Sequence, residues 1–168
     1  MPNANGTLCW YALKTRSRHE KSVRAQLTDL GIENLLPTTW RLSQWKDRKK
    51  KIETPLFSGY CFSRFTWEDR LSVLKTHGVV HIVGSGHRPE AIPDEEIDAL
   101  KVLMAGPIPY DAHPYLREGM AVSVVRGPLV GLRGILLRKE KPYRLVIAVH
   151  LIQQAAAVEI DAADVITI

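Results

Sequence analysis

A dense run of cations is the feature of this sequence with the clearest chemical use. Between residues 41 and 51 there are six basic side chains and one acid. The cations expected to contact nucleic acid are Lys46, Arg48, Lys49, Lys50 and Lys51. Gathered at a hairpin tip, such cations repel one another, project into solvent and neutralise phosphates without reading bases. A solvated loop or a strand edge protected by lysines would have the same composition, so both remain alternatives. Trp45 either stacks on a base or folds back on the domain.

A second set of cations leads from a loop into a helix. Its members are Lys14, Arg16, Lys21 and Arg24, with Arg18 between them. Lys21 and Arg24 are three residues apart and therefore share one helical face. This set is a second candidate for DNA contact, although an ordinary surface helix also has a charged face.

Catalytic and metal-binding patterns do not emerge from the sequence. The segments 43–46 and 72–75 both have the spacing S-x-x-K, but the companion motif of the enzymes that use it is absent. His77 and His81 straddle Gly78, which is the wrong geometry for two ligands on one helix face. We therefore expect no catalytic residues, no metal and no cofactor, and an enzyme is the most distant alternative.

The composition is that of an ordinary globular protein with excess positive charge. The 168 residues include 45% hydrophobic types, and the formal net charge is +5. A chain of this length buries about two-thirds of its unfolded surface without disulfides. Cys9 and Cys61 lie in apolar runs typical of reduced, buried thiols, which favours a cytoplasmic protein. The polar start lacks an apolar signal segment, and no apolar run is long enough to cross a membrane.

Three prolines between Gly106 and Pro114 mark a division into two domains. Because proline interrupts helices and sheet ladders, we expect a linker over residues 106–117. The first domain, residues 1–105, alternates strand and helix patterns. The expected strands are 8–13, 34–42, 56–65 and 79–83, and the expected helices are 19–30, 67–77 and one that begins at 93. This order predicts an α+β fold with helices on one face of a sheet.

The second domain, residues 118–168, has a different pattern. Five short apolar strands are expected at 120–125, 135–137, 145–152, 156–160 and 165–168. Strands this short and this closely spaced predict a small β-barrel. The β-branched residues in the first and third of these strands favour a stable barrel over a helical hairpin.

The segment 119–136, with glycines at 127, 131 and 134, resembles the KOW motif of small SH3-like barrels. Trp10-Tyr11 and the turn Phe57-Ser58-Gly59-Tyr60 precede it in the order found in NusG-type transcription factors. The chain thus resembles the NusG family over residues 8–168. The resemblance implies a ferredoxin-like βαβ N-terminal NusG domain, a linker and a KOW barrel. Ser58 stands in place of the family's usual proline, which should loosen the turn.

The resemblance also implies binding sites in the first domain. An aromatic patch would bind the clamp helices of bacterial RNA polymerase. The expected patch consists of Trp10, Tyr11, Phe57, Tyr60 and Phe62. Because neighbours along a strand point to opposite faces, part of this set is expected to lie in the core instead. The basic hairpin would reach upstream DNA, and the region of the first helix would reach the non-template strand.

The KOW loop is the expected contact with a second partner. Its residues are Gly127, Pro128, Leu129, Gly131 and Gly134. In general factors of the family this loop binds a small-subunit ribosomal protein or a termination factor. Leu129 stands where the family often has phenylalanine and keeps an apolar contact of smaller area. A buried anchor for the loop is the alternative reading of Leu129.

Together these features predict a monomeric, cytoplasmic transcription elongation and antitermination factor. It would bind RNA polymerase, bridge the DNA cleft and suppress pausing or termination by preferring one polymerase state. The tail, residues 144–161, looks closer to operon-specific paralogues than to the general factor. The alternative is a ribosome- or RNA-associated KOW protein without a role at the polymerase, and the aromatic patch argues against it.

Overall fold

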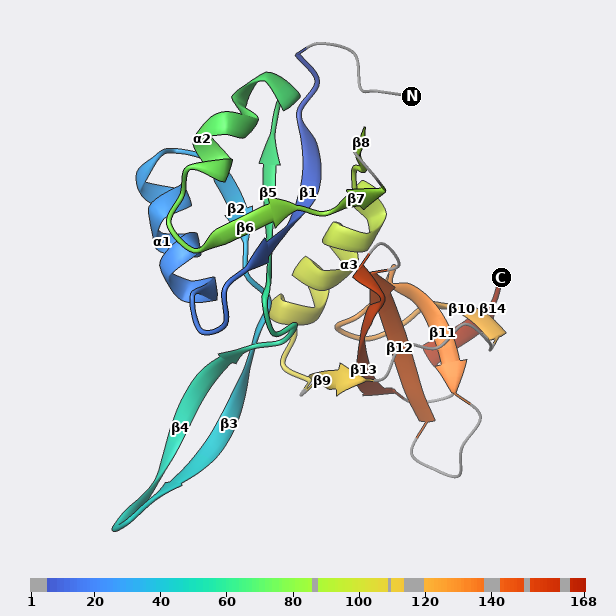
Figure 1. The fold of residues 1–168 in the computed structure, drawn as a ribbon. Helices are drawn as coiled ribbons and strands as arrows, with labels where there is room; N and C mark the ends of the chain where they lie inside the picture. Colours follow the sequence, from blue (N-terminus) through green and yellow to red (C-terminus); the bar gives the residue numbers. More distant parts are fainter. Residues whose placement is uncertain are drawn as a thin grey trace. The chain divides into compact units, whose positions relative to one another are not determined.

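The computed structural model describes residues 6–85, 88–108, 110–113, 120–137, 143–149, 152–160 and 164–168. The chain divides into two compact units, Met1–Ile92 and Pro93–Ile168. Figure 1 shows the elements of each unit, which are described in turn. The mixed α/β character expected from the sequence is confirmed.

The first unit is built on a four-stranded antiparallel sheet in the order β2-β5-β1-β6. The strands are β1 (Cys9–Thr15), β2 (Glu33–Leu35), β5 (Tyr60–Phe65) and β6 (Val79–Ile82). Helices α1 (Glu20–Asp29) and α2 (Arg70–Leu74) cover one face of this sheet (Figure 1). A single 3₁₀ turn at Trp67–Asp69 replaces the first part of the longer helix expected over residues 67–77. A short pair, β7 (Gly84–Ser85) with β8 (Arg88–Pro89), follows β6.

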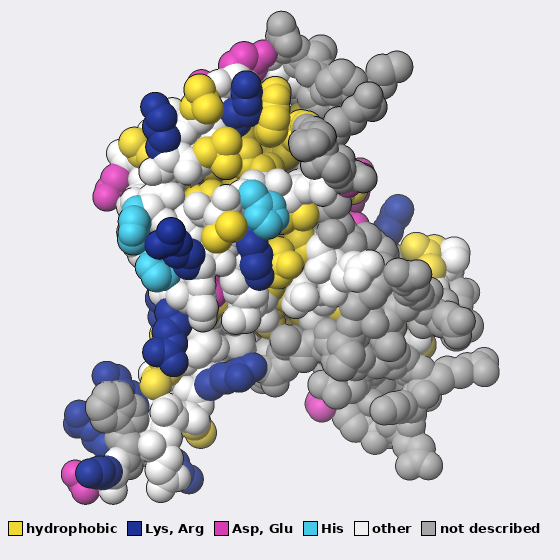
Figure 2. Space-filling model, in the orientation of Figure 1, with side chains coloured by type: hydrophobic (Ala, Val, Ile, Leu, Met, Phe, Trp, Pro, Cys, Tyr) yellow, Lys and Arg dark blue, Asp and Glu magenta, His cyan; other side chains and the backbone are white. Residues whose placement is uncertain are grey.

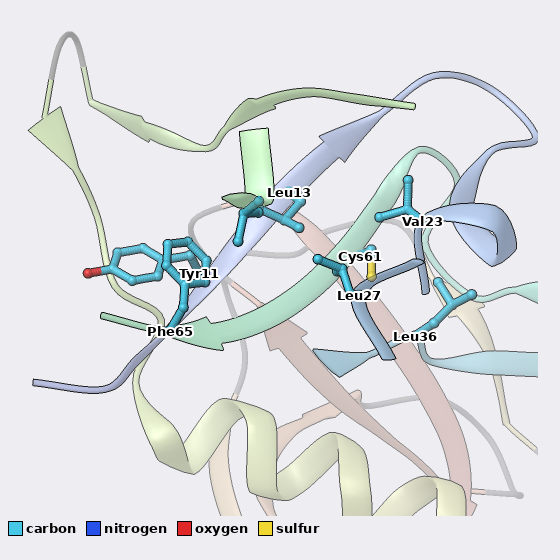
Figure 3. Close-up of a cluster of buried hydrophobic side chains, with 8 residues drawn as sticks. Tyr11, Leu13, Val23, Leu27, Leu36, Cys61 and Phe65 are labelled. Atoms are coloured by element: carbon cyan, nitrogen blue, oxygen red, sulfur yellow. The ribbon is translucent and has the colours of Figure 1, made fainter. Parts of the chain in front are cut away.

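The core of the first unit lies between this sheet face and the two helices (Figure 3). Tyr11 of β1 and Phe65 of β5 lie side by side, with ring centroids 4.7 Å apart. Val23 and Leu27 are one helical turn apart on α1 and are fully buried against the same cluster. Each such side chain contributes about 1.5–3 kcal/mol through burial, so this cluster fixes α1 on the sheet.

β3 (Thr38–Trp45) and β4 (Arg48–Pro55) form a separate two-stranded ribbon that extends away from the sheet (Figure 1). The pairing runs from Thr38 opposite Pro55 to Trp45 opposite Arg48, so only Lys46 and Asp47 form the turn. The single strand expected over 34–42 is divided at Pro37, which has no N–H for a ladder bond. Most of the basic segment therefore lies in paired strand rather than in a loop.

The second unit combines α3 (Asp94–Ala105) with a six-stranded antiparallel sheet in the order β14-β10-β11-β12-β13-β9. The strands are β9 (Tyr110–His113), β10 (Met120–Val124), β11 (Arg133–Leu137), β12 (Tyr143–Val149), β13 (Gln154–Ile160) and β14 (Val165–Thr167). The last five correspond to the five strands expected from the sequence. Closure of this sheet into an SH3-like KOW barrel stays a prediction.

Two features of the second unit differ from the expected domain plan. α3, which we placed in the first domain, groups with the second unit, because the division falls between Ile92 and Pro93. β9 lies inside the expected linker and pairs with β13 at the edge of the sheet. An edge strand tolerates prolines beside it, since one side of its backbone needs no ladder partner. Among the described residues, no helix has the length and apolar character needed to span a membrane.

Candidate functional site

The expected aromatic patch is divided between the two faces of the first sheet. Tyr11 lies in the core under the helices, 4.7 Å from Phe65 and 5.8 Å from Trp67 between ring centroids. Trp10 and Phe62 lie on the opposite face, because Phe62 pairs with Ala12 and Trp10 is two residues from Ala12. Tyr11 is thus core beneath the helices, as the alternation of β1 predicts. Trp10, Phe57 and Phe62 are buried as well, so four of the five side chains of the expected patch are inaccessible.

Tyr60 is the accessible aromatic on the opposite face. Trp10, Phe57 and Phe62 are buried, and Phe57 packs edge-on against Phe62 at 6.3 Å. Tyr60 is half-buried, and the Lys14 Nζ lies 4.4 Å from the centroid of its ring. The two residues face each other across β1 and β5, so the register brings them together. This pair presents an aromatic ring and a positive charge at one place.

The turn that precedes Tyr60 is fixed from α1. Gly59 has a φ of +80°, a conformation that glycine adopts without steric cost. Its N–H donates a 2.8 Å hydrogen bond to Oε1 of Glu20, whose side chain is buried. This charge-assisted hydrogen bond restrains the turn at Gly59, next to Ser58, which we expected to loosen it. Glu20 was not identified from the sequence as a residue that supports the site. Its position at the start of α1 is the one feature of the sequence that sets it apart.

Two of the expected DNA-binding cations hold the base of the ribbon. The Lys21 Nζ donates a 2.6 Å hydrogen bond to the Glu53 carbonyl and lies 3.8 Å from Glu53 Oε2. The Arg24 Nη1 lies 3.6 Å from Oε1 of the same carboxylate. The Thr38 hydroxyl donates to this Oε1 at 2.8 Å. α1 is thereby tied to both strands of the ribbon, which gives Lys21 and Arg24 a positioning role.

The environment of Glu53 favours its ionised form. The pKa of the Glu53 carboxyl is lowered, chiefly by the hydrogen bond from Thr38 and further by the charges of Arg24 and Lys21, against the opposing effect of burial. A carboxylate with these three partners stays charged when the protein folds. The ribbon base is therefore an ionic joint that acid would weaken.

The remaining basic side chains of the ribbon are exposed. Figure 2 shows dark-blue side chains gathered over β3 and β4, away from the body of the first unit. The exposed cations are Arg41, Lys46, Arg48, Lys49, Lys50 and Lys51. Asp47 at the turn is the acid among them. Such a surface attracts polyanions over a distance of about a Debye length, roughly 8–10 Å at moderate salt. Arg16 is also exposed, in the loop before α1.

The expected KOW loop follows β10. Gly127 and Gly131 have φ values of +84° and +90°, which explains the glycine spacing. Leu129 is only 1% exposed. Its side chain packs close to Gly106, where an added Cβ would lie 3.3 Å from the Leu129 Cδ2. Leu129 is thus a buried anchor of the loop in this structure, the alternative that the sequence left open. Binding of a partner by the loop stays a prediction.

The two thiols differ in their surroundings. Cys9 is half-buried and Cys61 is buried, and neither is part of a disulfide bond. Burial raises the pKa of the Cys61 thiol to about 12, so it remains protonated and inert. Within the described parts of the chain, no three His, Cys, Asp or Glu side chains gather as metal ligands would.

One family model matches more than half of the chain. Residues 8–101 match the family model described as transcription termination factor nusG. No curated protein matches the chain. Among solved structures, the chain is similar to one of Thermotoga maritima NusG, described as showing domain interaction, with 22% identity and a TM-score of 0.51. That match covers 96% of this chain and 98% of that one.

A second similarity is weaker. The MjSpt4:Spt5 complex in conformation A matches with 16% identity and a TM-score of 0.32, over 95% of this chain and 97% of that one. The Thermotoga maritima match supports the fold alone, because its identity is low.

Proposed function

Since the chain belongs to the NusG family of transcription factors, we propose that it is an elongation factor that binds the clamp helices of bacterial RNA polymerase. From there it would bridge the DNA cleft and suppress pausing or termination. One observation carries the proposal: the family domain, residues 8–101, contains both a half-exposed aromatic–lysine pair on its sheet and an exposed basic ribbon.

The polymerase contact is assigned to the sheet face that carries Tyr60. Tyrosine offers a large apolar area and a hydroxyl, which suits a protein interface. Lys14 beside the ring adds a charge that can meet an acidic side chain of the clamp helices. The bond from Gly59 to Glu20 holds the turn in place, so the turn loses little conformational freedom when the partner docks. Trp10, Phe57 and Phe62 support this face from within.

The DNA contact is assigned to the ribbon. Its exposed cations can neutralise phosphates, and each neutralised phosphate releases counterions and strengthens binding in a salt-dependent way. Lys21 and Arg24 act at the ribbon base, where they set its direction through Glu53. A ribbon tied to the polymerase-binding unit can reach DNA at a high effective concentration.

Binding of polymerase at the Tyr60 face and of DNA at the ribbon gives a mechanism that depends on binding alone. A protein that contacts polymerase and DNA together favours the polymerase state in which both contacts fit. The paused state becomes less populated if its geometry does not allow the polymerase contact and the DNA contact at the same time. The shift in population is limited by the difference in affinity for the two states. We further propose a specialised, operon-specific role and a second partner, a ribosomal protein or a termination factor, at the KOW loop.

A transcription assay tests this function. Bacterial RNA polymerase is stalled and released on a template with a strong pause site, and the pause lifetime is measured with and without the full chain. The proposal expects a shorter pause with the native chain and a smaller effect when Lys49, Lys50 and Lys51 are replaced by glutamine. The control variant is Lys101→Gln, which changes a lysine of α3 outside the ribbon. An unchanged pause lifetime with the native chain would contradict the proposal.

A further inference from the structure

One face of the ribbon combines exposed apolar side chains with cations. Strand alternation places Trp40 and Leu42 of β3 on the same face as Lys49 and Lys51 of β4. Leu42 is directly opposite Lys51, and Gln44 is opposite Lys49. Trp40 is opposite Glu53, the acid at the base of this face, which Lys21 and Arg24 pair with. An apolar stripe on one strand therefore lies beside a cationic stripe on the other. We call this surface the Trp40 face.

The exposure of the Trp40 face is unusual for its residue types. Trp40 is 59% exposed and Leu42 is 72% exposed. Tryptophan is highly buried on average, so two large apolar neighbours left in solvent on one narrow ribbon indicate a binding surface. Lys49 and Lys51 are exposed beside them. The surface is therefore both apolar and positively charged.

Lys51 also organises the tryptophan. Its Nζ lies 5.3 Å from the centroid of the Trp40 ring, within the range of a cation–π contact. The contact restrains the indole, so less side-chain freedom is lost when a ligand stacks on it. It also places a positive charge within a few ångströms of any group that lies against the ring.

We propose that the Trp40 face binds an unpaired DNA strand, with a base stacked on Trp40 and the neighbouring phosphates at Lys49 and Lys51. This inference rests on the proposed function, which brings DNA to the ribbon. Proteins that hold single strands use aromatic side chains for the bases and a basic track for the backbone. Trp40 and Leu42 are roughly 7 Å apart along the strand, a spacing that an extended single strand can match.

Duplex DNA fits this surface less well. Its bases are stacked on one another, and exposing a base face costs a few kcal/mol in unstacking. An unpaired strand has already lost that stacking. A basic protein is also disfavoured as the occupant, because the exposed cations of the ribbon would repel it. Glu53, which could attract it, is already paired with Lys21 and Arg24 at the base. Asp47 is the acid left at the tip.

Fluorescence anisotropy with the full chain tests the assignment. The probes are a labelled single-stranded oligodeoxynucleotide, the same sequence as a duplex, and the same sequence as RNA. Trp40→Ala should weaken single-strand DNA binding about tenfold or more, the usual effect of losing one stacked base. It should leave duplex binding unchanged. The slope of log affinity against log salt should also stay constant, because no charge is removed.

Two further variants sharpen the test. Trp40→Phe keeps an aromatic platform and should retain most of the single-strand affinity. Lys51→Gln should weaken both single-strand and duplex binding and should reduce the salt slope by about 0.7–0.9. Circular dichroism of each variant checks that the ribbon is still folded. Ser43→Ala, on the opposite face of β3, is the matched control and should change neither affinity.

Several outcomes would overturn the inference. Equal weakening of duplex and single strand by Trp40→Ala would show that Trp40 acts through the structure of the ribbon. Equal loss with Trp40→Phe, or tighter binding of RNA than of DNA, would also contradict it. Capture of RNA polymerase by the same chains is measured in parallel. If the chain captures polymerase but Trp40→Ala does not weaken strand binding, this inference alone is refuted. If Trp40→Ala weakens strand binding but the chain does not capture polymerase, the proposed function is refuted and the strand-binding surface is supported.

Discussion

The Oε1 atom of Glu20 lies 2.8 Å from the backbone nitrogen of Gly59, and this hydrogen bond joins the first turn of α1 to the turn that presents Tyr60. The two residues are far apart in the sequence, and the carboxylate is buried. The bond satisfies the backbone N–H of a turn glycine and fixes the edge of the sheet face that we assign to polymerase. Its contribution to folding can be measured directly.

Glu20→Ala should destabilise the first unit by about 1–3 kcal/mol, because it leaves the Gly59 N–H buried without an acceptor. All four tryptophans lie in that unit, so tryptophan fluorescence during urea unfolding of the full chain reports on it selectively. Glu33→Ala is the control, since it removes an exposed ion pair with Arg64 and should cost less than about 1 kcal/mol. Equal effects of the two variants would contradict the role of Glu20.

Acid should weaken the ribbon base through Glu53. The pKa of its carboxyl is lower in the folded protein than the ordinary value of 4.5. A lowered pKa stabilises the fold above the ordinary value, and this stabilisation is lost as the pH falls through the folded value. Glu53→Gln should therefore make the stability less sensitive to pH below about 4.5.

Urea unfolding at a series of pH values checks this expectation. Asp47→Asn, which removes a carboxyl from the exposed tip, is the matched control. If Glu53→Gln loses stability on acidification as steeply as the native chain, the ionic joint does not contribute to the stability of the ribbon base.

The thiol of Cys61 should be unreactive in the folded protein. Burial raises its pKa to about 12, so almost no thiolate forms near neutral pH. In a Cys9→Ser chain, a thiol reagent at pH 8 should label Cys61 only after denaturant is added. Rapid labelling of this chain without denaturant would show that β5 opens under native conditions.

Local sequence patterns predicted most elements of the fold. The spacing of Val23 and Leu27 marked α1, and the alternation of β1 predicted that Trp10 and Tyr11 lie on opposite faces. Strand boundaries were predicted less well. Pro37 divides a run that reads as one strand, and the hairpin expected to carry its cations at the tip is a ribbon whose paired strands hold most of them.

Residue types could indicate candidate residues of the site but not their contacts. Lys21 and Arg24 read as free cations, because their partner Glu53 lies about thirty residues away and has no local signature. Nothing in the local sequence marks Trp40 as exposed, since tryptophan is highly buried on average. Its exposure follows from the ribbon leaving the sheet, which is a property of the tertiary fold.

Capture of bacterial RNA polymerase by the full chain, with Tyr60→Ala beside the native sequence, is the direct test of polymerase binding at the Tyr60 face. Trp40→Ala is the control, because it removes an aromatic ring from the ribbon instead of the sheet. We expect the native chain and the control to capture polymerase and Tyr60→Ala to lose most of the binding. Equal capture by all three would contradict the assigned interface. Capture of ribosomes but not polymerase by the native chain would contradict the proposed function itself.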